Sequence, residues 1–261
     1  MKIISWNVNG IRAIEKKDFV LLLNDFNADV VCIQETKANP TQLSDNLLAP
    51  PIFENGNAAE GSWFSFWSSA KKPGYSGTAI YSKMKPDKVE LMNVSEFDDE
   101  GRTLVAHYGN IIIISAYFPN SQDAGKRLDY KLAYCDAMLK MCNEFVEQGK
   151  NIVLSGDYNI AHKSIDLANP VANEGNAGYL PEERAWMDKW ISSGYVDTFR
   201  EFCKERNQYT WWSYRFRSRE RNIGWRIDYQ CVNKSFLPKI KNSSILSSVL
   251  GSDHCPIMIE F

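Results

Sequence analysis

The sequence predicts one mixed α/β domain that spans residues 1–261. Short apolar runs rich in Ile, Val and Tyr recur from end to end, as strands do, and longer segments with helical periodicity lie between them. No repeat, low-complexity tract or linker interrupts this alternation. A chain of this length can bury a substantial core within one large domain.

Seven apolar runs, bounded by polar residues, Gly or Pro, are the expected strands. They comprise residues 3–8, 29–34, 78–81, 110–117, 151–155, 227–232 and 256–261. The run at 110–117 contains four consecutive isoleucines, which favours a strand that is buried on both faces.

Helices are expected at 11–26, at 126–148 and from Pro181 onward. The second segment places one apolar row on a helical face: Leu128, Leu132, Cys135, Leu139, Cys142 and Val146. Pro181 is followed by two glutamates, which is typical of a helix start. The remaining long loops are 39–51, 118–125 and 166–180, and loops displayed on a rigid sheet often carry function.

The charge of the chain is unevenly distributed. The whole sequence has 30 Lys and Arg against 32 Asp and Glu, but residues 200–226 have eight Lys or Arg against three Glu, a local balance of +5. A ligand responds to that local field. Arginines alternate at 215, 217, 219 and 221, which predicts that all four lie on one side of an extended segment. The acidic run at 98–100 is interpreted as a solvated turn.

The six cysteines form no C-x-x-C pair and no zinc-type spacing with histidine. Cys32, Cys231 and Cys255 lie in apolar runs, so we expect buried free thiols and a reducing compartment. The first residues enter a strand pattern without a signal-peptide core, and no apolar run has the length of a membrane span. We therefore expect a cytoplasmic protein without a membrane segment.

Polar and acidic clusters follow three of the predicted strands and precede the last one. They contain Asn7 and Asn9, Glu35, Asp157, and Asp253. Carboxylates at such places are costly to bury unless they cap a turn, pair with a base or bind a cation. One such cluster alone is most often a turn or a cap, but several together suit a hard ion such as Mg²⁺, which takes oxygen ligands.

An acid inside a strand-like segment adds to this pattern. Asp228 lies within Gly-Trp-Arg-Ile-Asp-Tyr, where an unpaired carboxylate is unfavourable. His254 can supply the partner, and an Asp–His pair fixes the tautomer of the imidazole and raises its basicity.

These residues belong to an ordered set of motifs. The set is ISWNVNGIRA, CIQETK, KPGYSGTAIYSK, DDEGR, SAYFPN, SGDYNIAHKSIDLANP, NAGYLPEERAW, GYVDTFR, YTWWSYR, NIGWRIDY and GSDHCPI. It resembles the exonuclease III / AP endonuclease family of DNA-repair enzymes, within the wider endonuclease–exonuclease–phosphatase fold, over residues 1–261. The resemblance implies a four-layer α/β sandwich, in which two packed mixed β-sheets are flanked by helices, and a single catalytic domain.

The resemblance also implies the reaction and its metal. The expected activity is Mg²⁺-dependent hydrolysis of the phosphodiester 5′ to an abasic nucleotide in duplex DNA, with Mn²⁺ as a substitute ion. Activity as a 3′→5′ exonuclease or a 3′-phosphodiesterase is also expected. Glu35 matches the main metal ligand, and Asn7, Asn9 and Asp253 match positions near the metal. The family has Asp or Asn at position 9, and asparagine lowers the negative charge of the site.

The catalytic positions implied by the resemblance are Asp157, Asn159, Asp228, His254, Tyr117 and Asn120. Asp157 matches the residue that orients or deprotonates the attacking water. His254, paired with Asp228, matches the histidine that contacts the scissile phosphate, and the others match groups that line the water or the phosphate.

Two further sets are implied for substrate binding. Trp211, Trp225 and Ile227 match a pocket for the abasic sugar, although strand tryptophans often pack in a core instead. The DNA-contacting set is Tyr75, Asn173, Asn176, Arg215, Arg217, Arg219 and Arg221. Arg215 is also a candidate for insertion into the groove, because Asp123 stands where certain family members have a groove-inserting arginine.

Several functions remain open at this point. The first is a monomeric nuclease that acts on double-stranded DNA containing abasic sites or 3′-blocked ends. An alternative is a nuclease of the same family that acts mainly as an exonuclease or on modified nucleotides such as uracil. A phosphatase or phosphodiesterase on small or lipid phosphate esters shares the fold, but does not need a wide basic face. A non-catalytic DNA-binding module is disfavoured by the intact acids and His254.

Overall fold

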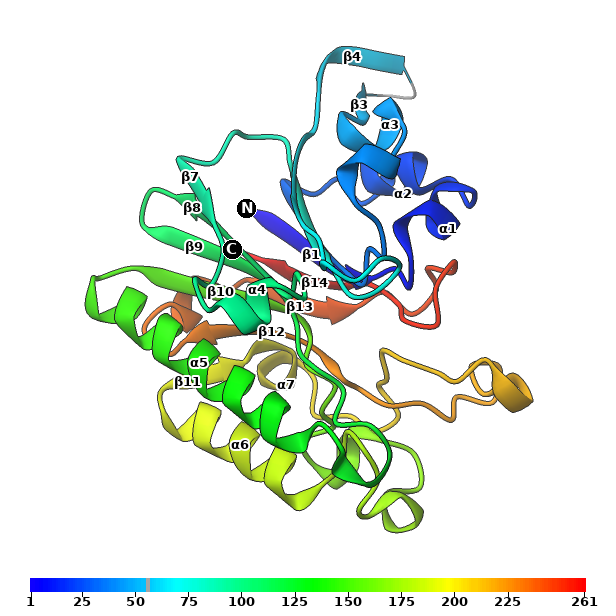
Figure 1. The fold of residues 1–261 in the computed structure, drawn as a ribbon, viewed down its shortest axis with the longest axis vertical. Coiled ribbons are helices and arrows are strands. Elements are labelled where there is room, and N and C mark those ends of the chain that lie inside the picture. Colours follow the sequence, from blue (N-terminus) through cyan, green and yellow to red (C-terminus); the bar gives the residue numbers. More distant parts are fainter. Residues whose placement is uncertain (55–56) are drawn as a thin grey trace.

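The computed structural model describes residues 1–54 and 57–261. Two six-stranded mixed sheets pack face to face, and helices cover their outer faces (Figure 1). The first sheet has, in spatial order, β13 (Asn242–Ile245), β14 (Ile257–Glu260), β1 (Lys2–Asn7), β2 (Val30–Gln34), β6 (Thr78–Ser82) and β5 (Phe64–Ser68). The second has β11 (Tyr195–Asp197), β12 (Asp228–Asn233), β10 (Asn151–Asp157), β9 (Ile111–Tyr117), β8 (Thr103–Tyr108) and β7 (Lys88–Glu90). A separate hairpin pairs β3 (Pro51–Glu54) with β4 (Asn57–Ser62).

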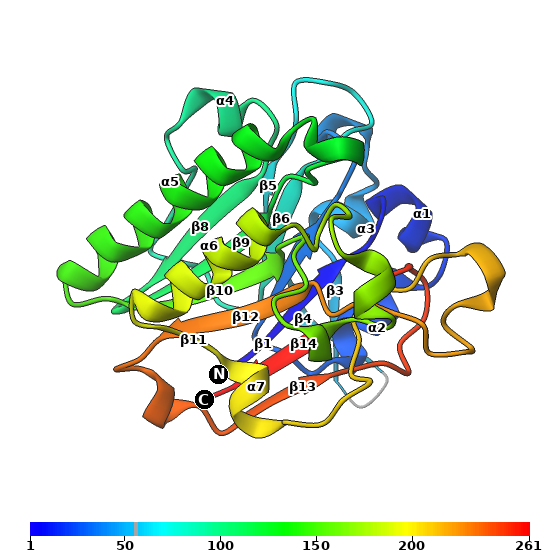
Figure 2. The same ribbon diagram turned by 90° about the horizontal axis from the view of Figure 1, so that it is seen from below.

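Helices form the outer layers of this sandwich. Helices α5 (Leu128–Glu147) and α6 (Pro181–Ser192) lie on the second sheet, whereas α1 (Ile11–Glu15), α2 (Phe19–Asp25) and α3 (Asp45–Leu48) lie on the other side of the molecule (Figures 1 and 2). The remaining short helices are α4 (Ser95–Asp98), α7 (Thr198–Phe202) and 3-10 turns at Pro40–Gln42, Asp123–Gly125, Ser164–Asp166, Pro170–Asn173, Arg215–Arg217 and Leu237–Lys239. This arrangement confirms the predicted four-layer α/β sandwich.

The core consists of three apolar layers. One layer lies between the two sheets and contains residues from both, such as Ile3, Ile80, Ile113 and Val153. The other two lie between a sheet and its helices. The central strand β9 is buried on both faces, as its run of isoleucines predicted. The apolar row of α5 faces the second sheet, as its periodicity predicted.

The structure departs from the sequence-based expectation at two kinds of place. The expected helix at 11–26 is wrong, because Asp18 adopts a left-handed φ of 62° and separates α1 from α2. The strands β3, β4, β5, β7, β8, β11 and β13 were not expected. Several of them are short or exposed, and β4 is exposed along nearly all of its length, so their sequences lack a strong apolar run.

A polar seam crosses the interior between the sheets. Gln34 Nε2 donates to Ser5 Oγ at 3.1 Å and to Ser115 Oγ at 3.2 Å, which joins the two sheets. Gln230 Nε2 makes the equivalent link, donating to the carbonyl of Ile3 and to Ser155 Oγ, each at 3.2 Å. Because buried amides must be hydrogen-bonded, this seam fixes how one sheet sits on the other.

All six cysteines are free thiols, and all except Cys203 are buried, as predicted for the three in apolar runs. Burial raises the pKa of Cys32 to about 12, despite hydrogen bonds from Ser115 and Ser155 that lower it. Such thiols are unreactive. Within 1–54 and 57–261, no helix combines the length and the apolarity needed to cross a membrane.

Strand direction determines where the functional residues gather. Strands β1 and β2 are parallel, as are β9 and β10, so each pair ends at a common edge. Strand β12 runs antiparallel to β10, and Asp228 at its start lies opposite Asp157 at the end of β10. Side chains that are far apart in the sequence therefore meet at one edge of the sandwich.

Candidate active site

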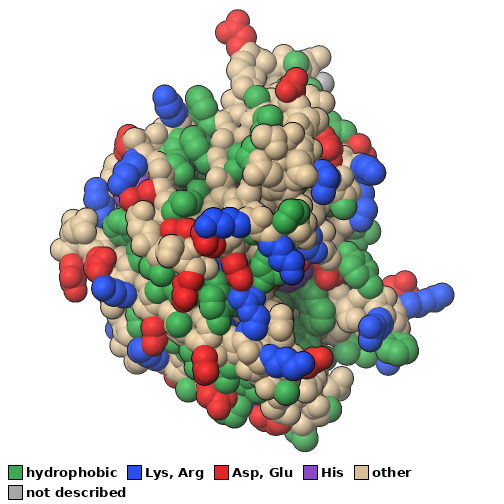
Figure 3. Space-filling model, viewed as in Figure 1, with side chains coloured by type: hydrophobic (Ala, Val, Ile, Leu, Met, Phe, Trp, Pro, Cys, Tyr) green, Lys and Arg blue, Asp and Glu red, His purple; other side chains and the backbone are tan. Residues whose placement is uncertain are grey.

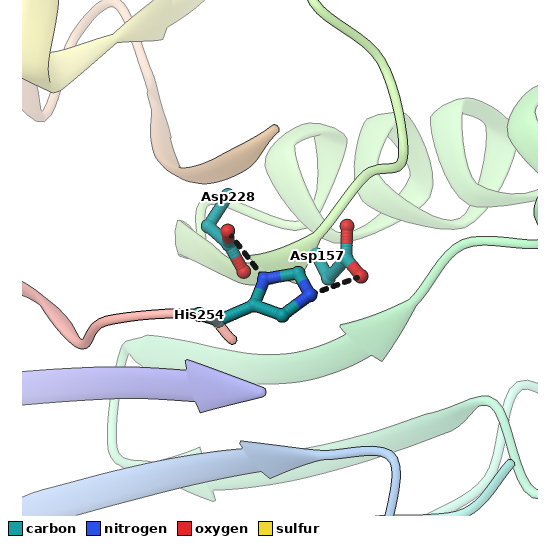
Figure 4. Close-up of side chains that lie close together, drawn as sticks. All are labelled: Asp157, Asp228 and His254. Carbon is teal, nitrogen blue, oxygen red and sulfur yellow. Dashed lines mark hydrogen bonds and ion pairs between the residues drawn. The ribbon is translucent and has the colours of Figure 1, made fainter. Parts of the chain in front are cut away.

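The centre of the site is a buried group of two aspartates and one histidine (Figure 4). Asp228 Oδ2 accepts a hydrogen bond from His254 Nδ1 at 2.9 Å, and His254 Nε2 lies 3.9 Å from Asp157 Oδ2. All three side chains are at most 5% exposed. The structure therefore contains the Asp–His pair that the sequence predicted, and it adds Asp157 on the other side of the same ring.

The electrostatics of this group follow from burial and mutual charge. Burial by itself lowers the pKa of His254, but the charge and hydrogen bond of Asp228 outweigh it, with help from Asp157, and raise that pKa to about 10. Burial raises the pKa of Asp157 to about 7, and the charge of Asp228 adds to the rise while His254 opposes it. At neutral pH the imidazole is therefore cationic, and Asp157 titrates near neutrality.

Several N–H groups converge on Asp157. Its Oδ2 accepts from Asn7 Nδ2 at 3.0 Å and from Asn159 Nδ2 at 3.2 Å, and its Oδ1 accepts from the Asn159 backbone N–H at 2.8 Å. Asn159 has a left-handed φ of 52°, which turns its side chain back toward the carboxylate. Asn120 Nδ2 donates to Asn159 Oδ1 at 3.0 Å, so these four predicted residues form one connected cluster.

A buried ion pair that the sequence did not reveal supports this cluster. Lys131 Nζ donates to the carbonyl of Asn159 at 2.7 Å and to Glu183 Oε1 at 2.6 Å. Both charged side chains are fully buried. Ser121 Oγ also donates to Glu183, at 2.9 Å. Because breaking a buried pair is strongly destabilising, this contact holds the loops of Asn159 and Ser121 firmly against α5 and α6.

The predicted metal-binding residues lie beside this centre. Asn9 Nδ2 donates to Asp253 Oδ1 at 2.9 Å, and Lys37 Nζ bridges Asn9 Oδ1, at 2.5 Å, and Glu35 Oε1, at 2.8 Å. Glu35 is partly exposed and has a left-handed φ of 58°. Lys37 was not among the predicted residues. Its ammonium demonstrates that the oxygens of Glu35 and Asn9 can jointly hold a cation.

The donor set at this place fits a hard metal ion. Carboxylate oxygens of Glu35 and Asp253, with the amide oxygens of Asn7 and Asn9, are the kind of ligand that Mg²⁺ takes in proteins. The tighter group of Asp157, Asp228 and His254 has ligand atoms within 4.8 Å of one another and could also hold an ion. However, His254 is protonated in that group and its ring nitrogens offer no lone pair to an ion, so the Glu35 side is the better candidate.

An aromatic cluster adjoins the histidine. Trp211 and Trp225 are both partly exposed, and their rings meet edge to face, with centroids 6.4 Å apart. They pack with Ile227, so the three predicted pocket residues form one cluster. Trp211 is bridged through the backbone to His254, and its indole N–H donates to Asp253 Oδ2 at 3.0 Å. Both tryptophans pack against a small buried apolar cluster and keep part of their surface exposed, so their role in a sugar pocket stays a prediction.

The arginine-rich segment does not have the predicted extended form. Residues Arg215–Arg217 form a 3-10 turn in which Phe216 and Arg217 have left-handed φ values of 58° and 50°. Arg219 folds back instead, with its guanidinium 4.6 Å from the ring centroid of Trp212. It donates to the carbonyls of Ser247, Val249 and Ser252. Only Arg215, Arg217 and Arg221 of the four are exposed, and the segment projects from the body of the protein (Figures 1 and 3).

Tyr75 lies in a network with two arginines and Glu100. Its hydroxyl accepts from Arg102 Nη2 at 2.9 Å and from Arg127 Nη1 at 2.6 Å, and both arginines pair with Glu100. The guanidinium of Arg102 is 5.1 Å from the ring centroid of Tyr117. The expectation that residues 98–100 form a solvated turn is therefore wrong for Glu100, because the two arginines draw its carboxylate into the network.

The two predicted asparagines of the long loop at 166–180 shape that loop. Asn173 Nδ2 donates to the carbonyls of Ala168 and Asn169, at 3.2 and 3.0 Å, and Asn176 Nδ2 donates to Asn173 Oδ1 at 3.1 Å. Asn176 is exposed and Asn173 partly so. Asp123 is exposed at the start of its own turn.

Comparison with known proteins agrees with this geometry. An exodeoxyribonuclease of Bacillus subtilis (strain 168) is 42% identical over 260 residues, which is 98% of each chain. DNA repair nuclease APEX1 of Danio rerio is 36% identical and covers 99% of this chain and 81% of its own length. The solved AP endonuclease LMAP from Leishmania major superposes with a TM-score of 0.85 at 25% identity, over 99% of this chain and 86% of that one. The sequence model of the Endonuclease/Exonuclease/phosphatase family matches residues 4–254, and the chain belongs to this family.

Proposed function

We propose that this protein is a DNA-repair nuclease that uses Mg²⁺ to hydrolyse the phosphodiester on the 5′ side of an abasic nucleotide in duplex DNA. One observation carries the proposal. The aromatic cluster of Trp211, Trp225 and Ile227 lies directly beside His254 and Asp253, so a sugar bound in a hollow on this cluster would have its phosphate at the catalytic group. Relatives named as AP endonucleases and exodeoxyribonucleases support the same activity.

Asp157 prepares the attacking water in this mechanism. Three N–H groups fix its carboxylate, and its raised pKa of about 7 suits a general base that works near neutral pH. It can therefore take the proton as the water attacks the phosphorus. Asn159 and Asn120 lie next to it and can hold the water or a phosphate oxygen through their amides.

His254 contributes positive charge at the phosphate. Asp228 holds Nδ1, so Nε2 is free to donate to a non-bridging oxygen, and the raised pKa of about 10 keeps the ring charged. Charge that is already in place when the transition state forms is usually the largest catalytic contribution. Burial raises the pKa of Tyr117 well above its usual value, so its hydroxyl stays neutral and can donate to the same phosphate.

Glu35, Asp253, Asn7 and Asn9 would hold Mg²⁺, with Mn²⁺ as a substitute. The ion, when bound, would neutralise charge on the phosphate and on the departing 3′-oxygen. Lys37 links Glu35 to Asn9 through the same oxygens, so the ion would have to displace its ammonium.

The substrate is recognised by shape and by charge. An abasic nucleotide has no base to stack or pair, so turning it out of the helix costs little. The aromatic hollow accepts the bare sugar, while the exposed Arg215, Arg217 and Arg221 bind phosphates without reading sequence. Tyr75, Asn173 and Asn176 would contact further phosphates.

Cleavage at 3′ ends is a second activity that the same site supports. A blocked 3′ end presents a phosphoester without a downstream duplex, and the same catalytic residues would cleave it as at an abasic site. Structural relatives include a 3′-5′ exonuclease from Neisseria meningitidis, with a TM-score of 0.84 at 24% identity, which supports the fold alone. Activity on uracil or other modified nucleotides would require the hollow to admit a base.

We further propose that residues 1–261 act as one catalytic domain and as a monomer. Buried unreactive thiols are compatible with a reducing compartment such as the cytoplasm.

A gel assay with four matched duplexes tests the proposed function. The duplexes carry an abasic site, a uracil, a recessed 3′ end or no lesion, and each is incubated with Mg²⁺ or with EDTA. We expect rapid Mg²⁺-dependent cleavage of the abasic strand, leaving a 3′-hydroxyl, and slower attack on the 3′ end. Asp157→Asn, which keeps the shape of the site, serves as the inactive control. Equal cleavage of the intact and abasic duplexes would contradict the proposal.

A further inference from the structure

A small cavity adjoins the aspartate of the Asp–His pair. Its volume is about 10 Å³, and Arg226, Asp228, Gln230, Ser243 and Ile257 are among the residues that line it. A single water molecule needs about that much room for its centre. The cavity is therefore large enough for one water molecule and too small for an organic ligand.

Two residues that line this cavity each carry a buried acceptor without a donor among residues 1–54 and 57–261. These acceptors are Asp228 Oδ1 and Gln230 Oε1. The other polar atoms of these side chains are engaged, since Asp228 Oδ2 accepts from His254 Nδ1 (Figure 4) and Gln230 Nε2 donates to Ile3 and Ser155. The acceptor of Ile3 is a carbonyl, so the amide of Gln230 cannot be turned around without losing that bond. Buried acceptors of this kind are rarely left without a partner.

We propose that this cavity binds one ordered water molecule that donates a hydrogen bond to Asp228 Oδ1 and another to Gln230 Oε1. Both free atoms are acceptors, and a water molecule brings two donors. Residues two apart on a strand share one face and are separated by roughly 6.5 Å, a distance that side chains and one bridging water can span. A cation would also satisfy two acceptors, but a hard cation takes roughly six oxygen ligands, and among the described side chains that line the cavity only these two buried acceptors lack a donor.

The bound water makes Gln230 a positioning residue for the catalytic histidine. A continuous series of hydrogen bonds then runs from His254 through Asp228 and the water to Gln230, whose amide is tied to both sheets. Both oxygens of Asp228 are held, so its carboxylate cannot rotate away from the ring. The catalytic consequence rests on the proposed nuclease function, whereas the water site itself does not.

A cavity-filling substitution can remove the water without changing any catalytic residue. Ser243→Thr adds one methyl group next to the cavity, keeps the hydroxyl that bonds Thr198, and suits a strand. Ser82→Thr makes the same change at a buried strand serine at the far end of the first sheet. Gln230→Met removes one acceptor of the water and also the bonds to Ile3 and Ser155, so it supports the result of Ser243→Thr and is not interpreted without it.

High-resolution crystal structures and steady-state kinetics on the abasic duplex form the test. We expect wild type and Ser82→Thr to show one density peak within hydrogen-bonding distance of both oxygens. Ser243→Thr and Gln230→Met should lack it, with kcat lower by about tenfold and KM unchanged. The absence of a peak in the wild-type crystal would overturn the water site. A lost peak with unchanged kcat would overturn the positioning role. Failure of all variants and of the wild type to cut abasic DNA would count against the proposed function and leave the crystallographic result intact.

Discussion

The substitution Asp228→Asn tests how the charge on His254 is maintained. In the native protein Asp228 is the group that raises the pKa of His254 to about 10, against the burial that lowers it. An asparagine keeps the size of the side chain but removes its charge. Burial is then opposed only by the nearby charges of Asp157 and Asp253, so the pKa of the histidine falls toward its ordinary value of 6.5. If it reaches that value, only about one molecule in ten keeps the charged ring at pH 7.5.

The pH profile makes this magnitude measurable. We expect single-turnover cleavage of an abasic duplex by the native protein to rise as Asp157 loses its proton near pH 7 and then to remain level into the alkaline range. In Asp228→Asn the rate at pH 7.5 should fall by up to about tenfold, and activity should decline further with each unit of rising pH. The pH–rate profile of Asp228→Asn should therefore show a narrow maximum at lower pH in place of the level region of the native protein.

A matched control exists elsewhere in the same chain. Asp188 pairs with His162 Nε2 at 2.7 Å, outside the catalytic group, so Asp188→Asn removes the carboxylate of an Asp–His pair without touching the site. Its pH profile should match that of the native protein. A broad alkaline plateau in Asp228→Asn would refute the reasoning, because it would mean that His254 either stays charged without its partner or does not need the charge.

Three further outcomes are expected. Glu35→Ala should remove most Mg²⁺-dependent cleavage and weaken binding of Mg²⁺ in a titration followed by tryptophan fluorescence. Cleavage by this variant at the native rate would contradict the assignment of Glu35 as a metal ligand. Asp157→Asn should be inactive yet raise the melting temperature at pH 8. Folding raises the pKa of Asp157, so the native protein loses stability as the pH rises from 3.8 to about 7 and this buried side chain becomes charged. The rise in melting temperature caused by Asp157→Asn should therefore become smaller when melting is measured toward pH 4. Arg217→Ala should flatten the salt dependence of DNA binding. Arg219→Ala should chiefly lower the melting temperature, because the native guanidinium donates to three carbonyls. Equal effects of the two substitutions on salt dependence and on melting temperature would contradict this division.

Sequence reasoning succeeded where the signal was local. The long apolar runs of β1, β2, β9, β10 and β12 were recognised, since burial on both faces leaves a continuous apolar pattern. It failed at short or exposed strands such as β4 and β7, which carry no such pattern. It also failed at Asp18, because one left-handed residue can divide a helix without disturbing its periodicity.

The arginine segment shows the same limit at the level of the site. Alternation predicts a common side only if the backbone is extended, and the left-handed Phe216 and Arg217 break that condition. Arg219 is held by Trp212 and by three carbonyls of a loop that is about thirty residues away in the sequence. The charge of the segment was predictable, but the division of its arginines between surface and interior was not.

By itself the sequence determined the mixed α/β class, the acids at strand ends, the pairing of Asp228 with His254 and the family resemblance. These features depend on residue type and on nearby neighbours. Only the tertiary structure decided that Asp157 faces the other side of the His254 ring, that Lys37 joins Glu35 to Asn9, and which arginines are free. The register of β10 against β12 and the packing of one sheet on the other set these distances. Both arise from contacts between segments far apart in the chain, which no local pattern encodes.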